Sequence, residues 1–135
     1  MIKDILNGLR RAWLLQNLWG NPIMGKGTKI AAFVEIGRGV KVGKNCKIQA
    51  FTFIPPGVTI EDDVFIGPHV CFTNDRHINA PKEWDKTLVK RGAKIGAGTT
   101  IIAGVTIGEN SFVAAGSLVT KDVPDGAFVK GRPSG

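Results

Sequence analysis

Residues 89–107 read Val-Lys-Arg-Gly-Ala-Lys-Ile-Gly-Ala-Gly-Thr-Thr-Ile-Ile-Ala-Gly-Val-Thr-Ile, and an aliphatic residue occupies every sixth position of this stretch. The same period extends over most of the chain, with one interruption. No α-helix repeats every six residues, and a simple strand has a period of two. The period therefore predicts hexapeptide repeats of the parallel β-helix kind. The positions that define it are Met24, Ile30, Ile36, Val42, Ile48, Ile54, Ile60, Ile66, Phe72, Val89, Ile95, Ile101, Ile107, Val113 and Val119.

Two further series share this period and predict the shape of each repeat. Small or β-branched residues stand four places after each defining position, which suits a second inward-facing row. Three places after it, twelve of fifteen residues are Gly, Asn or Asp, which tolerate a left-handed backbone at least cost. Each hexad is expected to be a short strand followed by a corner with positive φ. With three strands to a coil, the pattern predicts an all-β fold of about five triangular coils.

Three bulky residues depart from the corner pattern at a regular spacing. Phe33, Phe51 and His69 lie 18 residues apart, so we expect them at one corner of three successive coils. Such a column predicts a ridge that packs against something, most simply a neighbouring subunit. The alternative is an ordinary turn at this corner, with the column merely exposed.

Composition and charge restrict the class of protein. The 135 residues are enough for one domain with a sizeable core. Two cysteines make neither a disulfide framework nor a metal site, which fits a cytoplasmic setting; Cys46 belongs to the inward series and Cys71 has no assigned role. A net charge of +7, spread along the chain, suits a protein that handles polyanionic small molecules, although a basic surface without that role is the alternative. Without Tyr or aromatic residues among basic runs, nucleic acid is not an expected partner.

Residues 1–23 follow a helical pattern instead. The expected helix is amphipathic, with one apolar face formed by Ile2, Ile5, Leu6, Leu9 and Trp13. Its charged residues interrupt any apolar run long enough to span a bilayer, and no small-residue cleavage site follows. We expect this segment to cap the open end of the β-helical domain, residues 24–135. Membrane contact through residues 1–20 is a less favoured alternative.

The period slips once, between Phe72 and Val89, where eleven residues are inserted. Arg76 stands at a position where a small inward-facing residue is required, so the chain is expected to leave the β-helix near residues 74–76. A single polar loop in a regular solenoid usually carries the function, so we place the site in the loop near 74–88.

Several motifs resemble the hexapeptide acyltransferases, and in particular the acetyltransferases that act on the 3-amino group of nucleotide-linked sugars. They are Phe-Thr-Asn-Asp at 72–75, Glu-Trp at 83–84, Thr-Leu-Val-Lys-Arg-Gly-Ala at 87–93, Ala-Gly-Ser-Leu-Val-Thr-Lys-Asp-Val-Pro at 115–124 and Val-Lys-Gly-Arg-Pro at 129–133. The resemblance implies a left-handed β-helix and acetyl-CoA as co-substrate, with no metal. It also implies surface polysaccharide synthesis and a homotrimer with sites between subunits.

The resemblance further implies roles for individual residues. Asn74 would hold the sugar or its amine near the thioester. Contacts to the substrate would come from Arg76, Glu83 and Trp84. The pantetheine arm would run beside the backbone of Gly98, Ala103 and Ala115. Contacts to the phosphates would come from Lys121, Lys130 and Arg132. The sequence departs from the family pattern at His69, where Asn is common, and in the loop after Arg76, so the sugar is not determined.

Acetyl transfer needs a nucleophile, a proton acceptor and donors for the developing oxyanion. The two histidines are the candidate bases: His77 in the loop and His69 one strand before it. Asp75 would orient an imidazole or bind the sugar, unless it is an ordinary corner residue. An amine that binds unprotonated can attack directly, and positioning by Asn74 would then supply most of the catalysis.

The sequence also bears on three alternatives to this N-acetyltransferase. An O-acetyltransferase would need one histidine as general base, because a hydroxyl is a weak nucleophile. A carbonic anhydrase of this fold binds zinc through three histidines, and two cannot supply them. A non-catalytic β-helical scaffold would explain the short chain and altered loop, but the retained loop and tail motifs favour an enzyme.

Overall fold

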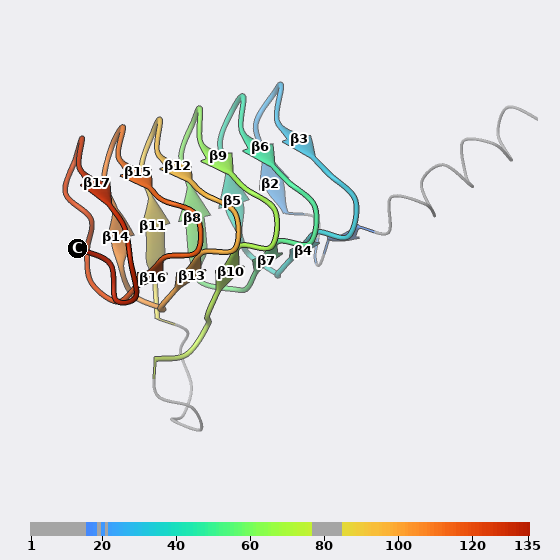
Figure 1. The fold of residues 1–135 in the computed structure, drawn as a ribbon. Coiled ribbons are helices and arrows are strands. Elements are labelled where there is room, and N and C mark those ends of the chain that lie inside the picture. The colour runs from blue at the N-terminus through green and yellow to red at the C-terminus, as the bar shows by residue number, and fades with distance from the viewer. Residues whose placement is uncertain (1–15, 19, 21, 77–84) are drawn as a thin grey trace, which may run out of the picture.

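The computed structural model describes residues 16–18, 20, 22–76 and 85–135. In these ranges the chain forms short strands joined by corners and wound into a triangular prism (Figure 1). The strands are β1 (Asn17–Leu18), β2 (Ile23–Met24), β3 (Lys29–Ile30), β4 (Glu35–Ile36), β5 (Lys41–Val42), β6 (Lys47–Ile48), β7 (Phe53–Ile54), β8 (Val58–Ile60), β9 (Phe65–Ile66), β10 (Cys71–Phe72), β11 (Thr87–Val89), β12 (Lys94–Ile95), β13 (Thr100–Ile101), β14 (Thr106–Ile107), β15 (Phe112–Val113), β16 (Leu118–Val119) and β17 (Phe128–Val129).

The strands form three parallel sheets, one on each side of the prism. Sheet A has the order β1-β4-β7-β10-β13-β16, sheet B β2-β5-β8-β11-β14, and sheet C β3-β6-β9-β12-β15-β17. Each strand pairs with the strand one coil away; Ile36 of β4, for example, lies opposite Ile54 of β7. This is the predicted left-handed parallel β-helix, but it has about six turns where the sequence predicted about five coils. The predicted hexads correspond to β2–β16, and β1 and β17 add a strand at the two ends.

The six-residue positions form the core, as predicted. Thirteen of the fifteen are buried, and the other two, Met24 and Ile30, belong to the first coil. The second series also faces inward, and Cys46 is buried within it. Polar members of that series find backbone acceptors, since Thr52 Oγ1 donates to the Gly67 carbonyl at 3.0 Å.

Left-handed corners join the strands, and thirteen of the fifteen predicted corner residues have positive φ. Phe33, Phe51 and His69 adopt it too, at 59°, 63° and 58°, so the alternative of an ordinary turn at this corner is wrong. The geometry of the coil therefore determines the backbone conformation at this corner, even where the side chain is bulky. The two exceptions in the described part are Asp75, where the chain leaves the prism, and Asp122.

At the N-terminal end, the prism begins earlier than the sequence predicted. Strand β1 pairs with β4, so the helix expected within residues 1–23 does not include Asn17–Leu18. This pairing gives β4 a neighbouring strand at the N-terminal edge of sheet A. In addition, Gln16 Nε2 donates to the Ile30 carbonyl of the first coil at 2.6 Å. Residues 1–15, which carry most of the expected helix, lie outside the described residues. In the described ranges, no helix has the length and hydropathy that a bilayer crossing requires.

Candidate functional site

Two edges of the prism flank sheet A, and the predicted site residues divide between them. The ring edge precedes each strand of sheet A and carries, coil by coil, Phe33, Phe51, His69, Gly98 and Gly116. The loop edge follows each strand of sheet A and carries Arg38, Pro56, Asn74, Ala103 and Lys121. The strand registers make these positions equivalent in successive coils, which lie about 4.8 Å apart. The third edge joins sheets B and C.

Three rings stack along the first half of the ring edge. The ring centroids of Phe33 and Phe51 lie 5.0 Å apart at an angle of 7°, and those of Phe51 and His69 lie 4.9 Å apart at 12°. In the next two coils the column continues as Gly98 and Gly116, where an added Cβ would meet no heavy atom within 4 Å. The edge therefore changes from a ridge to bare backbone directly after His69.

On the loop edge, hydrogen bonds tie the base of the inserted loop to the next coil. Arg76 Nε donates to the Ala103 carbonyl at 3.2 Å, and the Arg76 backbone N–H donates to Asp85 Oδ2 at 3.1 Å. The Ala103 N–H in turn donates to Thr73 Oγ1 at 2.9 Å. Both backbone groups of buried Ala103 thus have partners within the chain. Asn74 is half-buried and lies between Thr73 and Arg76, which these hydrogen bonds hold in place.

The predicted residues are therefore not all brought together within one chain. On or beside the ring edge lie His69, Gly98, Ala115, Lys130 and Arg132, whose Nη1 donates to the Gly116 carbonyl at 3.0 Å. On the loop edge lie Asn74, Asp75, Arg76, Ala103 and Lys121. Four residues of nearly extended chain lie between His69 and Asn74, which places the two Cα atoms roughly 16 Å apart. These two side chains cannot serve one reacting atom from the same prism.

Part of the predicted site lies outside the described residues, namely His77, Glu83 and Trp84. Their assigned roles stay predictions. Within the described ranges, no three His, Cys, Asp or Glu side chains are grouped so that they could hold a metal ion.

Neither cysteine is activated as a nucleophile. Burial raises the pKa of the Cys71 thiol above its ordinary value, and burial is also the largest cause of the raised pKa of Cys46. A thiol with a raised pKa is mostly protonated at neutral pH and reacts slowly. Cys71 lies on the outer face of sheet A, in register with Phe53.

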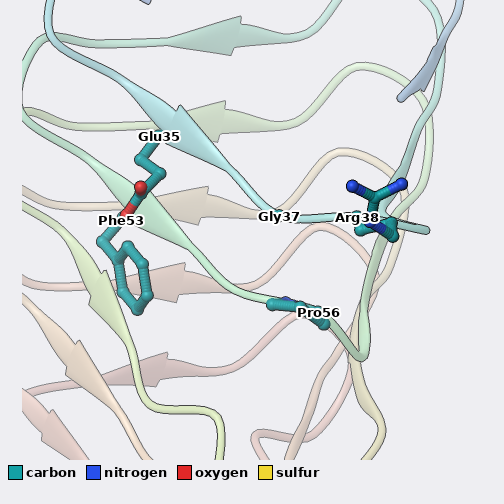
Figure 2. Close-up of a pocket in the computed structure, with 5 residues that line it drawn as sticks. All are labelled: Glu35, Gly37, Arg38, Phe53 and Pro56. Atoms are coloured by element: carbon teal, nitrogen blue, oxygen red, sulfur yellow. The ribbon is translucent and has the colours of Figure 1, made fainter. Parts of the chain in front are cut away.

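Sequence reasoning missed a cavity on this face. Its volume is about 280 Å³, and it is lined by Glu35, Gly37, Arg38, Phe53 and Pro56 (Figure 2). Arg38 and Pro56 precede Asn74 by 36 and 18 residues, which is two coils and one coil. That spacing is the sequence signal that identifies them as neighbours of the loop.

Comparison with known proteins points to one family. The family described as "Bacterial transferase hexapeptide (six repeats)" matches residues 21–56, 40–74 and 86–121. The bifunctional protein GlmU of Caldicellulosiruptor saccharolyticus is 39% identical over 112 residues, which cover 83% of this chain and 23% of that protein. The dTDP-3-amino-3,6-dideoxy-alpha-D-galactopyranose 3-N-acetyltransferase of Aneurinibacillus thermoaerophilus is 50% identical over 54 residues, or 40% of this chain and 28% of that protein.

Solved structures share the fold. A mutant of AntD, an N-acyltransferase from Bacillus cereus, in complex with dTDP and coenzyme A, has a TM-score of 0.79 at 21% identity; the match covers 96% of this chain and 86% of that chain. The chain spans less than a third of the length of the two curated relatives.

Proposed function

The chain belongs to the bacterial transferase hexapeptide family, and we propose that it transfers an acetyl group from acetyl-CoA to the amino group of a nucleotide-linked amino sugar. It would act as a cytoplasmic homotrimer in surface polysaccharide synthesis. Two relatives support this substrate class, since one is a 3-N-acetyltransferase of a dTDP-linked amino sugar and the other is an N-acyltransferase in complex with dTDP and coenzyme A.

The observation that carries the proposal is that the predicted site residues lie on two different edges of the prism. His69 ends the ring stack in the same coil in which Asn74 begins the loop. Groups on the two edges of one prism are too far apart to act at one reacting atom, but they can do so if the ring edge of one subunit meets the loop edge of another. A closed ring of three prisms satisfies this condition and creates three equivalent sites between subunits.

Acetyl-CoA would lie along the bare part of the ring edge. Gly98 and Gly116 leave open space there, so a pantetheine arm can approach the backbone of Gly98 and Ala115. Ala103 is fully buried and its N–H and carbonyl are hydrogen-bonded within the chain, so it would support the loop edge of the neighbour by close packing and would not contact the pantetheine arm. The exposed cations available to the phosphates are Lys130 and Arg132 beside the ring edge and Lys121 on the loop edge of the neighbour.

In the reaction, the amine nitrogen attacks the thioester carbonyl and the coenzyme A thiolate leaves. Asn74 would orient the amine, and Asp75 would orient an imidazole or bind the sugar. The substrate would be held by Arg76, Glu83 and Trp84. A neutral amine can pass its proton to the departing thiolate, whereas a hydroxyl acceptor would need His77 or His69 as general base.

Release of the coenzyme A thiol tests the proposal. Acetyl-CoA is offered with a panel of nucleotide-linked 3-amino and 4-amino sugars and their hydroxyl counterparts, and turnover with an amino sugar is expected. Turnover with hydroxyl sugars alone, abolished by His77→Ala or His69→Ala, would make the protein an O-acetyltransferase. No turnover with any acceptor, together with no coenzyme A binding in calorimetry, would favour a β-helical scaffold.

A further inference from the structure

The cavity shown in Figure 2 lies on the N-terminal side of the inserted loop, away from the coils proposed to hold coenzyme A. Arg38, Pro56 and Asn74 occupy one position in three successive coils of the loop edge. At about 4.8 Å per coil, Arg38 stands roughly 10 Å from the level of Asn74, with Pro56 midway. A hexose ring and its anomeric phosphate span a comparable length.

The two ends of the cavity differ in chemistry. At one end the half-buried ring of Phe53 lies beside Glu35, and at the other lies the exposed guanidinium of Arg38 (Figure 2). An aromatic ring stacks on a nucleobase, and a carboxylate accepts a ring N–H such as the N3–H of thymine or uracil. A guanidinium binds phosphate oxygens in a bidentate manner. The lining therefore suits a molecule with a planar base at one end and phosphate at the other.

The floor between these ends is closely packed. Gly37 packs so closely on the ring of Pro56 that no side chain fits at that position. The stem of Arg38 lies against Gly20, where an added Cβ would come 2.9 Å from Arg38 Cγ. A lining held in this way loses little conformational freedom when a ligand binds.

We propose that this cavity binds the nucleoside diphosphate of the sugar substrate, with the base against Phe53 and Glu35 and the diphosphate at Arg38. The inference rests on the proposed function, because the attached sugar would then extend over Pro56 towards Asn74. The two substrates would approach the loop from opposite ends of the prism.

Calorimetric titration with dTDP tests the assignment. Arg38→Gln and Phe53→Ala are each expected to raise the dissociation constant roughly tenfold or more, because they remove a charge-assisted hydrogen bond and a stacking surface. Arg38→Lys should keep part of the affinity, since it keeps the charge but not the planar fork. Inorganic pyrophosphate, which has no base, is expected to bind more weakly than dTDP; equal binding would overturn the assignment of the base to Phe53 and Glu35.

Two variants at matched positions are the controls. Lys44 has the same position in its hexad as Arg38, but it lies on the third edge and not on the loop edge. Phe65 is the first residue of a strand in sheet C, just as Phe53 is the first residue of a strand in sheet A. Lys44→Gln and Phe65→Ala should leave the affinity for dTDP unchanged. Affinity that is equally unchanged in Arg38→Gln and Phe53→Ala would overturn the site.

Coenzyme A binding separates failure of this inference from failure of the proposed function. Every variant should remain folded and bind coenzyme A as the wild type does. If the wild type acetylates amino sugars while Arg38→Gln and Phe53→Ala bind dTDP normally, only the nucleotide site is overturned. If the wild type binds neither dTDP nor coenzyme A, both proposals fail.

Discussion

Phe33, Phe51 and His69 each adopt a backbone conformation that bulky side chains rarely occupy. The left-handed conformation costs roughly 1–2 kcal/mol per residue, and a stacked aromatic pair returns about 0.5–1.5 kcal/mol beyond its buried area. Each ring therefore offsets much of the strain of its neighbours. The spacing of 18 residues predicts the column, but it cannot predict the stacking, because that depends on the rotamers the corner permits.

At Asn74, replacement by Ala is expected to lower kcat on the order of a hundredfold, because a misplaced amine loses the advantage of orientation. The affinity for coenzyme A should stay close to that of the wild type, since the pantetheine arm would lie on the ring edge. Thiol release measures the first quantity and calorimetry the second. An unchanged kcat would remove Asn74 from the active site.

At Cys71, alkylation should be slow near neutral pH and should accelerate as the pH rises. The thiolate is the reacting form, and burial raises the pKa of this thiol, so less thiolate is present at any given pH than in a free cysteine. Iodoacetamide labelling followed by mass spectrometry, from neutral pH to about pH 10, gives the profile. Cys46, fully buried, is the internal control and should react only on unfolding. A Cys71 rate equal to that of free cysteine at neutral pH would contradict the raised pKa.

Among the elements, β2–β16 could be predicted from the sequence because one six-residue period specifies burial, strand and corner together. The end strands β1 and β17 could not. Asn17–Leu18 falls in a segment with helical patterning, and Phe128–Val129 follows a stretch in which the period has lapsed after Val119. An end strand pairs on one side only, so its sequence is less constrained than that of a strand inside the stack.

The bare part of the ring edge yields a prediction at the same scale. Gly98→Phe should extend the ring stack by one coil and block coenzyme A, while the fold survives a cost of roughly 1–2 kcal/mol, as it does at Phe33 and Phe51. Gly126→Phe is the matched control, because Gly126 also has positive φ and open space but lies on the third edge. Calorimetry should show lost binding in the first variant and normal binding in the second. Retained binding in both would place the pantetheine arm elsewhere.

For the whole molecule, the sequence predicted the prism and the position of the loop, but not the cavity on the outer face of sheet A. Arg38 and Phe53 carry no recognisable motif, and they join Asn74 only through the stacking of coils. The separation of His69 from Asn74 likewise follows from the triangular cross-section. The proximity of Arg38 to Asn74 and the separation of His69 from Asn74 can be predicted only after each residue has been assigned to an edge.

The proposed trimer can be tested through the ring stack. Phe33 and Phe51 are 44% and 52% exposed in the single chain, and a neighbouring subunit would cover them. Phe51→Asp should therefore convert a trimer into monomers in sedimentation velocity, because it would bury an unpaired charge at the contact. Phe112→Asp is the control, since Phe112 is similarly exposed but lies on the outer face of sheet C. A wild-type monomer, or a trimer that survives Phe51→Asp, would contradict the contact.

Mixed trimers test most directly whether the active site is shared between two subunits. Gly98→Phe would block coenzyme A at the ring edge and leave the loop edge intact. Asn74→Ala would disable the loop edge and leave the ring edge intact. Equal amounts refolded together should regain about a quarter of the wild-type thiol release, because a quarter of the interfaces would join two intact edges. A mixture as inactive as its two parents, beside an active wild type refolded in the same way, would contradict a shared site.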